Sequence, residues 1–566
     1  MSNEYFFNTI IGKRKSRIVS GIHAALSAAQ IEKKIDFRQL PPILLEVPRE
    51  EAHGDFACTI AMLLAKELKR SPREIAGLIK NYFDCAATGV EKLDIAGPGF
   101  LNFYLPKSWL SPCLSELLAE GDDFGRSEAG SGKKVQVEFV SANPTGELHM
   151  GNARGAAIGD TLASLLDMSG HQVEREFYIN DAGNQISRFA ASLEARYLQL
   201  LGQDAQLPDD GYHGQDICDT MAALIKEEGN KYLGMESHLR KEYFTSYALQ
   251  EKITNAKKTL EKFGVVYDVW FSEQSLHDSG SVTDIIERLR QGGWVYEQDG
   301  AFWLASTRFG EEKDEVLVRA NGIPTYYAAD IAYHDNKFQR GFGLAIDIWG
   351  ADHHGHVARM KGAMAALGYS RDQLEVVLMQ LVHLYQGGEL LLMSKRAGTY
   401  VTLEELMETV GKDAARFFFV MRSAGSQMDF DLDLAKKQSA DNPVYYVQYA
   451  HARICSMLAK AAEEGYTLKD LPDDFSLLDH PSELALIRKL VDFPDEIIFA
   501  AQHFEPHRIA IYVQDLAALF HNFYSHCRVV GPDKDLSLAR LWLAKGTARV
   551  IANALKAMGV SAPEKM

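Results

Sequence analysis

The stretch VQVEFVSANPTGELHMGN, at residues 135–152, decides the fold of this 566-residue chain. Its first six residues predict a β-strand, and a turn containing Pro and Gly follows. A helical pattern then runs from about Ala153 to Met168. This order of strand, turn and helix opens a βα unit, so we predict an α/β domain built on a Rossmann-like sheet.

We predict three domains, at residues 1–113, 114–440 and 441–566. The first combines helical spacing with a strand-like run, FLNFYL, at residues 100–105, so we expect an α+β domain. The middle region carries the βα unit and a polar helical stretch near residues 188–267, which we interpret as an insertion between two halves of the sheet. The last region is helical to its end and is expected to be an all-α domain.

The composition is that of an ordinary globular chain, with 46% hydrophobic and 24% charged residues and no apolar run long enough to span a bilayer. The formal net charge of −17 excludes a broadly basic surface, although it permits a local basic patch. Charge alone favours a metabolic enzyme. The start of the chain lacks the features of a secretory signal, and the six scattered cysteines lack zinc-site spacing, so we expect a cytoplasmic protein without a membrane segment. The cysteines are Cys58, Cys85, Cys113, Cys218, Cys455 and Cys527.

The turn before the predicted helix is suited to bind a phosphate. Backbone N–H groups at a helix start have no intrahelical partner, and the helix dipole favours an anion there. Gly151 would let a nucleotide approach the backbone, and His149 could donate to phosphate oxygens as pyrophosphate leaves. For His-x-Gly taken alone, a plain strand–turn–helix with a histidine cap is the more frequent explanation, because short motifs match by accident.

A second short motif, LMSKRAGT at residues 392–399, is typical of a mobile loop that closes on a triphosphate. Ser394 and Lys395 could neutralise the phosphates in the transition state. Taken alone, this motif is more often a solvated basic loop. The two motifs together favour an ATP-binding site. One opens the first βα unit and the other follows the last strands, so the sheet can bring both to the same edge.

Several longer stretches are more specific than either motif. They are YINDAGNQ (178–185), WGADHHG (349–355), MDFDL (428–432), NPVYYVQYAHAR (442–453) and GVSAPEKM (559–566). HMGN at residues 149–152 and LMSK at residues 392–395 stand where class I synthetases carry His-Ile-Gly-His and Lys-Met-Ser-Lys. Taken together, these stretches resemble the arginyl-tRNA synthetase family over nearly the whole chain. The resemblance implies a class I catalytic domain between an amino-terminal tRNA-binding domain and an all-α anticodon-binding domain.

The resemblance also implies a pocket for arginine. A guanidinium group is a planar fork of donors that carboxylates and a phenol hold best. Tyr326 and Asp330 are four residues apart, so they share one face if this segment is a helical turn. The resemblance places Glu273, Tyr326 and Asp330 at the guanidinium end and Glu138 and Asn143 at the α-amino end, with His149 also among the arginine-binding residues.

For ATP, the resemblance assigns roles to residues in both short motifs and in the WGADHHG stretch. Catalytic roles fall on His149, Asn152, Ser394 and Lys395, and ATP-binding roles fall on Gly151, Gly350, Asp352, Met393 and Lys395. The glycine and the acid of residues 350–352 are expected at the adenosine ribose. We expect Mg²⁺ to accompany ATP, and we assign no residue as a metal ligand.

Two positions depart from the family pattern. Asn152 replaces a histidine, and an amide can donate a hydrogen bond but cannot carry a proton or a charge. Leu392 replaces the first lysine of the loop motif, and Gly146 occupies the position where some family members carry a substitute lysine. One phosphate-neutralising charge is therefore unaccounted for. Lys395, Arg396 or a further residue, together with magnesium, must supply it.

Both outer domains are expected to contact tRNA. REEAHGDFAC, at residues 49–58, carries the likeness in the first domain, which the family uses at the tRNA corner. The basic run at residues 13–17 could meet phosphates, although a solvated helix face is the commoner explanation of such a run. The helical domain after Asn442 carries aromatic residues that could stack on unpaired anticodon bases, although most are expected to be core. The residues concerned are Lys13, Arg14, Lys15 and Arg17 in the basic run, and Tyr445, Tyr446, Tyr449, Phe520, Phe523 and Tyr524 in the helical domain.

The resemblance implies a reaction in two steps. The arginine carboxylate attacks the α-phosphate of ATP, which gives arginyl-adenylate and pyrophosphate, and the 2′-hydroxyl of the terminal adenosine of tRNA then attacks the adenylate. Positioning and charge stabilisation suffice, with little need for a general base. The resemblance further implies that arginine activation needs tRNA and that the protein is a monomer.

Two alternatives stay open. One is a synthetase of the same class for another amino acid, against which the acidic residues Glu138, Glu273 and Asp330 argue. The other is a non-catalytic, tRNA-binding paralogue. Asn152 and Leu392 favour the paralogue, whereas the retained His149, Ser394 and Lys395 oppose it, because a pure binding module has no use for them.

Overall fold

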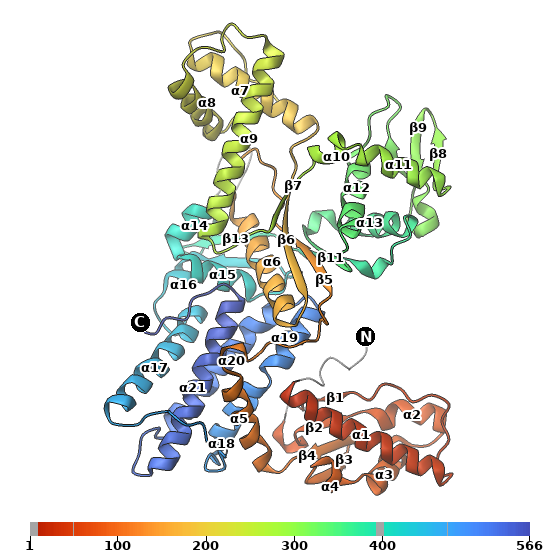
Figure 1. The fold of residues 1–566 in the computed structure, drawn as a ribbon, viewed down its shortest axis with the longest axis vertical. Coiled ribbons are helices and arrows are strands. Elements are labelled where there is room, and N and C mark those ends of the chain that lie inside the picture. The colour runs from red at the N-terminus through yellow and green to blue at the C-terminus, as the bar shows by residue number, and fades with distance from the viewer. Residues whose placement is uncertain (1–8, 49, 392–400, 473) are drawn as a thin grey trace.

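The structure is a computed structural model that describes residues 9–48, 50–391, 401–472 and 474–566. A parallel-sheet domain occupies the middle of an elongated molecule, with a helical insertion at one end and a helical domain and the N-terminal domain at the other (Figure 1). Among the described helices, none has both the length and the apolar character of a membrane span.

The N-terminal domain is α+β, as predicted. Its elements are α1 (Ile10–Ile31), β1 (Leu45–Glu46), β2 (Phe56–Cys58), α2 (Ile60–Leu68), α3 (Pro72–Tyr82), α4 (Cys85–Thr88), β3 (Lys92–Ala96) and β4 (Phe100–Tyr104). The strands form an antiparallel sheet in the order β1-β2-β4-β3, and the predicted strand at residues 100–105 becomes β4. Ser71 begins α3 through a capping box with Glu74, and Pro72 is suited to the first helical turn because it needs no N–H partner there.

The central domain is built on a five-stranded parallel sheet in the order β12-β11-β5-β6-β7. The strands are β5 (Lys134–Glu138), β6 (Gln172–Ile179), β7 (Val269–Ser272), β11 (Leu344–Gly350) and β12 (Leu374–Met379). The chain adds β6 and β7 on one side of β5 and later places β11 and β12 on the other side. The order therefore reverses between β5 and β11, and such a switch point opens a crevice at the carboxyl ends of the strands. The predicted Rossmann-like sheet is confirmed.

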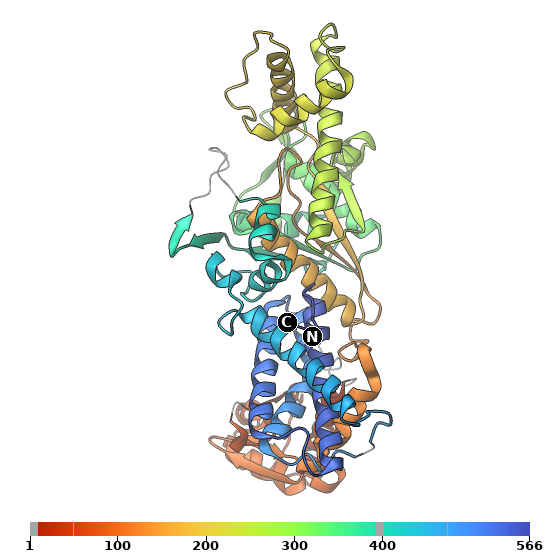
Figure 2. The ribbon, with the colours of Figure 1, turned by 90° about the vertical axis from the view of Figure 1, so that its left-hand side faces the viewer.

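Helices and a small antiparallel sheet surround this parallel sheet. They are α6 (Met150–Met168), α7 (Asn184–Leu200), α8 (Gln215–Glu228), α9 (Ser237–Lys262), α10 (Gln274–Asp278), α11 (Ser281–Gln291), β8 (Val295–Gln298), β9 (Ala301–Leu304), β10 (Glu315–Val318), α12 (Tyr326–Gln339) and α13 (His354–Ala366). In the sequence, helices α7 to α9 lie between β6 and β7, which pair with each other on the same side of β5, so, contrary to the prediction, the insertion does not separate two halves of the sheet. These helices have their own core, which includes Phe189, Tyr197 and Phe244. They project from the end of the molecule, as Figure 2 also shows, so an insertion can form there without breaking the parallel sheet.

A second small sheet leads from the central domain to the helical domain. Strands β13 (Val382–Gln386) and β14 (Glu389–Leu391) form a hairpin that extends from the side of the central domain (Figure 2), and β13 also pairs with β15 (Met428–Asp431). The remaining helices are α5 (Leu110–Glu120), α14 (Leu403–Val410), α15 (Lys412–Val420), α16 (Leu432–Lys436), α17 (Pro443–Glu463), α18 (Pro481–Val491), α19 (Phe493–Gln502), α20 (His507–His526) and α21 (Lys534–Ala557). Every regular element in the described part of the chain after Asn442 is thus a helix, as predicted.

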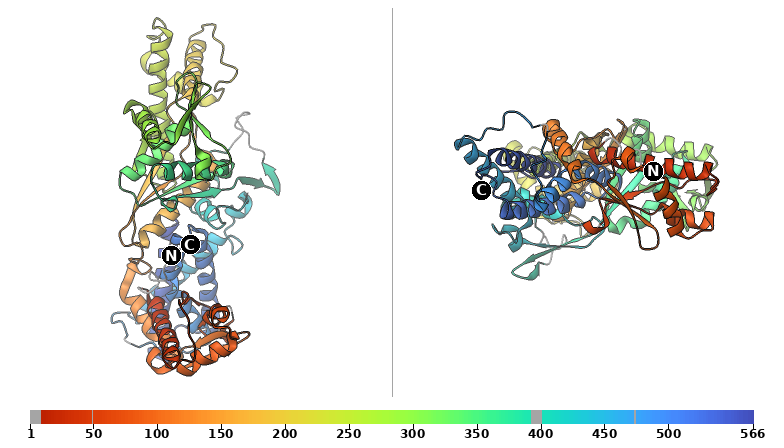
Figure 3. Two further views of the ribbon diagram at one scale, coloured as in Figure 1. Left: turned by 90° about the vertical axis from the view of Figure 1, so that its right-hand side faces the viewer. Right: turned by 90° about the horizontal axis from the view of Figure 1, so that it is seen from below.

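The N-terminal domain packs against the helical domain, although the two lie at opposite ends of the sequence (Figure 3). Arg488 on α18 pairs with Asp55 at 2.6 Å, and Lys15 on α1 pairs with Asp495 on α19 at 3.2 Å. Lys13 is another member of the predicted basic run, and its Nζ lies 3.7 Å from Glu116 Oε2. Two of the four cations in that run therefore serve contacts within the chain.

Candidate active site

A cavity of about 690 Å³ opens at the switch point of the parallel sheet. Its lining comes from the carboxyl ends of four strands and from the first turns of α12 and α13. The lining includes Glu138, Ser141, Tyr178, Glu273, Tyr326, Asp330, Tyr333, His334, Gly350, Asp352 and His356. The sheet therefore brings together side chains that are more than 200 residues apart in the sequence.

Three carboxylates from different elements meet in this cavity. Glu138 ends β5, Glu273 follows β7, and Asp330 lies in the second turn of α12. Burial raises the pKa of Glu138, and the positive charge of Lys337 opposes that effect. Burial also raises the pKa of Glu273, which shares a hydrogen bond with Tyr178. An acidic pocket so arranged suits a cationic ligand with several donors.

Asp330 stays ionised although it is half-buried. Burial by itself would raise its pKa, but the charge and hydrogen bonds of His334 and His356 outweigh burial and hold that pKa below its ordinary range. His356 Nε2 lies 2.6 Å from Asp330 Oδ2. Tyr326 begins the same helix and is 52% exposed, and the predicted sharing of one face with Asp330 is confirmed, since both side chains line the cavity.

The turn before α6 has the geometry of a helix start, as predicted. Gly151 N donates to His149 Nδ1 at 3.1 Å, and His149 N donates to Asn152 Oδ1 at 3.0 Å. The helix begins at Met150, three residues before the apolar pattern indicated, because this reciprocal cap satisfies two backbone donors. With Nδ1 acting as an acceptor, the proton of a neutral His149 lies on Nε2.

The predicted residues of this turn lie beside the cavity and not in its lining. The lining contains neither Asn143, which is exposed, nor His149, Gly151 or Asn152. The turn nevertheless adjoins the segment that follows the loop motif. Leu403 N donates to Leu148 O at 2.8 Å, and the backbone of His149 pairs with Thr402. Met393, Ser394 and Lys395 themselves, with Leu392, lie outside the described residues.

Two residues of the cavity have strained backbones that the sequence did not reveal. Val140 and Ser141 have φ values of 71° and 39°, in the left-handed region that β-branched residues in particular avoid. This bend ends β5 at Glu138 and turns Ser141 Oγ to donate to Glu138 Oε1 at 2.8 Å. Strain of this kind persists where the surrounding structure fixes the backbone, and here it borders the acidic pocket.

Gly350 ends β11 and Asp352 follows that strand, and both line the cavity. A Cβ added at Gly350 would stand 2.4 Å from Asp352 Oδ1, so the carboxylate folds back over a backbone that has no side chain. The absence of a side chain at Gly350 therefore lets the Asp352 carboxylate lie against the end of β11 at the cavity. Sequence reasoning found both residues through the WGADHHG stretch, whose continuation also supplies His356.

Other residues of the site were not predicted. Tyr178, Tyr333, His334 and His356 line the cavity, and Lys337 lies directly behind it. The spacing of Asp330, His334 and Lys337, at four and three residues on one helix, is a signal that could have identified the two cations as neighbours of the acid.

The aromatic residues of the helical domain divide into core and surface. Phe520 and Phe523 are fully buried, whereas Tyr449 is 41% exposed and stacks with Tyr445 at a ring distance of 6.3 Å. Arg453 lies over the Tyr524 ring at 4.2 Å. Two of the six are therefore buried core, fewer than predicted, and Tyr446 and Tyr524 are partly buried against that core. Tyr445 and Tyr449 on α17 are left as the accessible stacking surface.

Three protein-family models match successive parts of the chain. Residues 16–105 match the arginyl tRNA synthetase N terminal domain, residues 113–424 match the catalytic domain of the class I tRNA synthetases (R), and residues 447–566 match the DALR anticodon binding domain. The middle match alone covers more than half of the chain, and it contains the acidic cavity.

Similar proteins give the same result over the full length. The chain is 58% identical to an arginine–tRNA ligase of Heliobacterium modesticaldum, over 98% of this chain and 99% of that protein. It is 57% identical to an arginine–tRNA ligase of Desulfitobacterium hafniense, with the same coverage. The solved arginyl-tRNA synthetase of Thermus thermophilus superimposes with a TM-score of 0.74 at 25% identity, over 96% of this chain and 99% of that chain. By fold, by cavity and by these matches, the chain belongs to the arginyl-tRNA synthetases of class I.

Proposed function

We propose that this chain attaches L-arginine to its cognate tRNA in two steps, through an arginyl-adenylate formed from ATP. The observation that carries the proposal is the meeting of Glu138, Glu273 and Asp330 in one cavity at the switch point of a parallel sheet. Three carboxylates favour a cationic substrate over an apolar one. Arginine is the cationic substrate of the family to which the chain belongs.

Arginine would bind along the cavity from α12 to the end of β5. Asp330, Glu273 and Tyr326 would receive the guanidinium group, since two ionisable acids and a phenol match its donors. Glu138, with Asn143 and His149 nearby, would face the α-amino end. The ligand's carboxylate would then point toward the start of α6, where the helix dipole favours the anions of ATP.

ATP would lie across the switch point. Gly350 and Asp352 would hold the adenosine ribose, and Gly151 would let the phosphates approach the start of α6. His149 Nε2, Asn152 Nδ2, Ser394 and Lys395, with Met393 in the same loop, would stabilise the charge that develops as pyrophosphate leaves. Mg²⁺ would enter with ATP and be held mainly by its phosphates, because the described residues include no group of three acidic, histidine or cysteine side chains suited to a metal.

The second step would transfer arginine to the 2′-hydroxyl of the terminal adenosine of tRNA. The N-terminal domain would contact the tRNA corner and the helical domain would bind the anticodon, with Tyr445 and Tyr449 offering stacking faces. We further propose that the protein acts as a monomer in the cytoplasm and that arginine activation requires tRNA.

Arginine-dependent exchange of labelled pyrophosphate into ATP tests this proposal. Exchange should occur with arginine and not with lysine, and only when tRNA is present. Asp330→Asn keeps the shape of the side chain but removes its charge, so it should raise the KM for arginine by about tenfold or more and leave the KM for ATP near its original value.

Asp335→Asn is the matched control for Asp330→Asn. Asp335 lies on the same helix and is buried, but it binds Arg288 and Tyr369 and does not line the cavity. Its substitution should leave the KM for arginine unchanged. Tight tRNA binding without exchange under any condition would contradict the enzyme assignment and favour a binding paralogue.

A further inference from the structure

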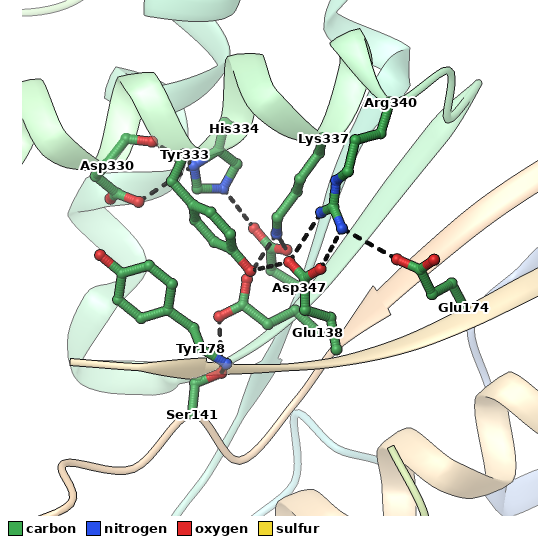
Figure 4. A network of polar contacts seen from close by, with 11 residues as sticks. Glu138, Ser141, Glu174, Tyr178, Asp330, Tyr333, His334, Lys337, Arg340 and Asp347 are labelled. Carbon is green, nitrogen blue, oxygen red and sulfur yellow. Dashed lines mark hydrogen bonds and ion pairs between the residues drawn. The ribbon is translucent and has the colours of Figure 1, made fainter. Parts of the chain in front are cut away.

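A chain of alternating charges lies behind the cavity, between α12 and β11 (Figure 4). Lys337 Nζ donates to Glu138 Oε2 and to Asp347 Oδ1, each at 2.6 Å. The other oxygen of Asp347 lies 2.7 Å from His334 Nε2. His334 Nδ1 lies 2.8 Å from the Asp330 carbonyl oxygen and 3.1 Å from Asp330 Oδ1. These contacts connect Glu138 to Asp330 without a break.

The two acids at the ends of this chain line the cavity, whereas the middle of the chain is hidden. Lys337 and Asp347 are 0% exposed and do not contribute to the lining. The residues Asp330, His334 and Lys337 follow one face of α12, so a single helix brings one cation to each of the two acidic ends. The substrate cavity and the buried charges therefore form one connected polar unit.

The surroundings fix the charge of each member. Burial by itself lowers the pKa of His334, but the negative charges of Asp347 and Asp330 outweigh burial and raise that pKa to about 10. Burial likewise lowers the pKa of Lys337, and Asp347 and Glu138 outweigh it and raise the pKa above its ordinary value. Both residues are cations at neutral pH, and they keep the pKa of Asp347 below its usual range although burial opposes them.

Stability alone gives little reason for such an arrangement. Replacing a buried ion network by apolar side chains of similar volume is often neutral or stabilising, because charges are costly to remove from water. A network of this kind is useful where the charge and the rotamer of a ligand-binding group must be fixed. Glu138 is held by Lys337 and by Ser141, and Asp330 is held by His334 and by His356.

We propose that Lys337 and His334, joined through Asp347, are positioning residues that fix the two acidic ends of the arginine site relative to each other. Lys337 acts through Glu138 and His334 acts through Asp330, so the α-ammonium and the guanidinium of one arginine meet carboxylates at a set spacing. This inference rests on the proposed function, because it takes Glu138 and Asp330 as partners of arginine.

Lys337→Met is the first test, carried out on the full-length protein with tRNA in the pyrophosphate exchange assay. Methionine keeps much of the volume but leaves Glu138 and Asp347 without their shared cation. The KM for arginine should rise by about tenfold or more, while the KM for ATP and the KM for tRNA stay near their original values. Lys337→Arg restores a positive charge and should recover most of the affinity for arginine.

A pH profile separates this role from a merely structural one. Without Lys337, burial and the nearby negative charge of Asp347 raise the pKa of Glu138 further, so Glu138 takes up a proton and loses its attraction for the α-ammonium. In Lys337→Met the KM for arginine should therefore fall as the pH rises from 6.5 to 8.5. The titratable groups that face Glu138 are His334, Tyr333 and Lys337 on α12, Asp347 on β11, Tyr178 on β6 and Tyr267 before β7. The lysine is the member that the variant changes.

His334→Gln is a second variant for the case in which Lys337→Met does not fold. A glutamine amide can donate to Asp347 but carries no charge beside Asp330, so the KM for arginine should again rise selectively. Arg340→Met is the matched control. Arg340 lies three residues beyond Lys337, at the C-cap of α12, and donates to both oxygens of the buried Glu176, at 2.6 and 3.0 Å, but it does not line the cavity. Its loss should lower the melting temperature without a selective change in the KM for arginine.

Asp330→Asn distinguishes failure of this inference from failure of the proposed function. If Asp330→Asn leaves the KM for arginine unchanged, the proposed arginine site is wrong. If Asp330→Asn raises that KM but folded Lys337→Met and His334→Gln do not, the site stands and the positioning role is overturned. The positioning role would also be overturned if the KM values for arginine, ATP and tRNA rose equally in Lys337→Met and rose in the same way in Arg340→Met.

Discussion

Arg416 Nη2 lies 2.5 Å from Asp160 Oδ2, although 256 residues separate the two side chains in the sequence. Arg416 belongs to α15 and is 0% exposed, and Asp160 belongs to α6, which starts beside the cavity. Arg416 Nε also donates to the carbonyl of Met558 at 2.7 Å, and Nη1 donates to that of Phe263 at 3.2 Å. One buried cation therefore connects the central domain, the base of the helical insertion and the end of the helical domain.

Arg416→Met should destabilise the protein strongly. The substitution removes a buried partner of Asp160 and leaves at least two buried carbonyl groups without their donor, so we expect a loss of about 3–5 kcal/mol in the free energy of unfolding. Urea unfolding followed by circular dichroism measures this loss. Lys437→Met removes an exposed ion pair with Asp441 and should cost less than about 1 kcal/mol. Similar losses in the two variants would contradict the connecting role of Arg416.

Gly559→Ala should destabilise through the same arginine. Gly559 has a φ of 65°, and an added Cβ would lie 2.4 Å from Arg416 Cζ, so both the backbone and the buried cation resist a side chain. We expect a loss of about 2–4 kcal/mol, measured by thermal unfolding. Gly465→Ala is the control, because Gly465 has a φ of 91° with nothing within 4 Å and should show only the backbone cost, about 1 kcal/mol.

Asp492→Asn should stabilise the protein in a manner that depends on pH. Asp492 lines a second cavity, of about 450 Å³, between α1, the segment around β1 and α19. Burial, and next the nearby negative charge of Asp495, raises the pKa of Asp492 to about 6. Because this folded-state value exceeds the unfolded one, the carboxylate costs stability above pH 6, and that cost disappears as the pH falls toward 4.

The gain from Asp492→Asn is therefore expected at pH 8, at no more than about 3 kcal/mol, and should vanish near pH 4. Thermal unfolding of both proteins at a series of pH values measures the difference. Asp441→Asn changes an exposed acid and should shift stability by less than about 0.5 kcal/mol at either end of the series. A gain of constant size at all pH values would show that the charge of Asp492 is not its cause.

His149→Ala should impair chemistry far more than stability. The cap from Gly151 N to His149 Nδ1 is worth about 1 kcal/mol, whereas a donor to the departing pyrophosphate is worth about 100- to 1000-fold in kcat. Pyrophosphate exchange and thermal unfolding measure the two effects separately. Thr402→Ala is the control. Thr402 lies beside His149, and its Oγ1 caps α14 by accepting a hydrogen bond from Glu405 N at 3.1 Å. It should cost about the same stability with little loss of kcat, and an equal loss of kcat in both variants would contradict a role for the imidazole.

Local sequence determined the elements and the class of fold. The run at residues 135–140 formed β5, the pattern after it formed α6, and the polar stretch near residues 188–267 formed the helices of an insertion. Such features depend on the spacing of apolar residues and on turn chemistry, both of which are written in neighbouring positions. The family resemblance supplied six residues that line the cavity, namely Glu138, Glu273, Tyr326, Asp330, Gly350 and Asp352.

Only the tertiary structure decided which of these residues meet and what holds them. The order of the parallel strands brings Glu138, Glu273 and Asp330 to one edge of the sheet, and the left-handed bend at Val140 ends β5 at the pocket. Neither Lys337 nor Arg416 stood out in the sequence, because a single position carries no sign of the distant carboxylate that it will face. The contacts of Lys337 with Glu138 and of Arg416 with Asp160 exist only once the sheet and the helical domain have packed, so a local pattern does not reveal these two partners.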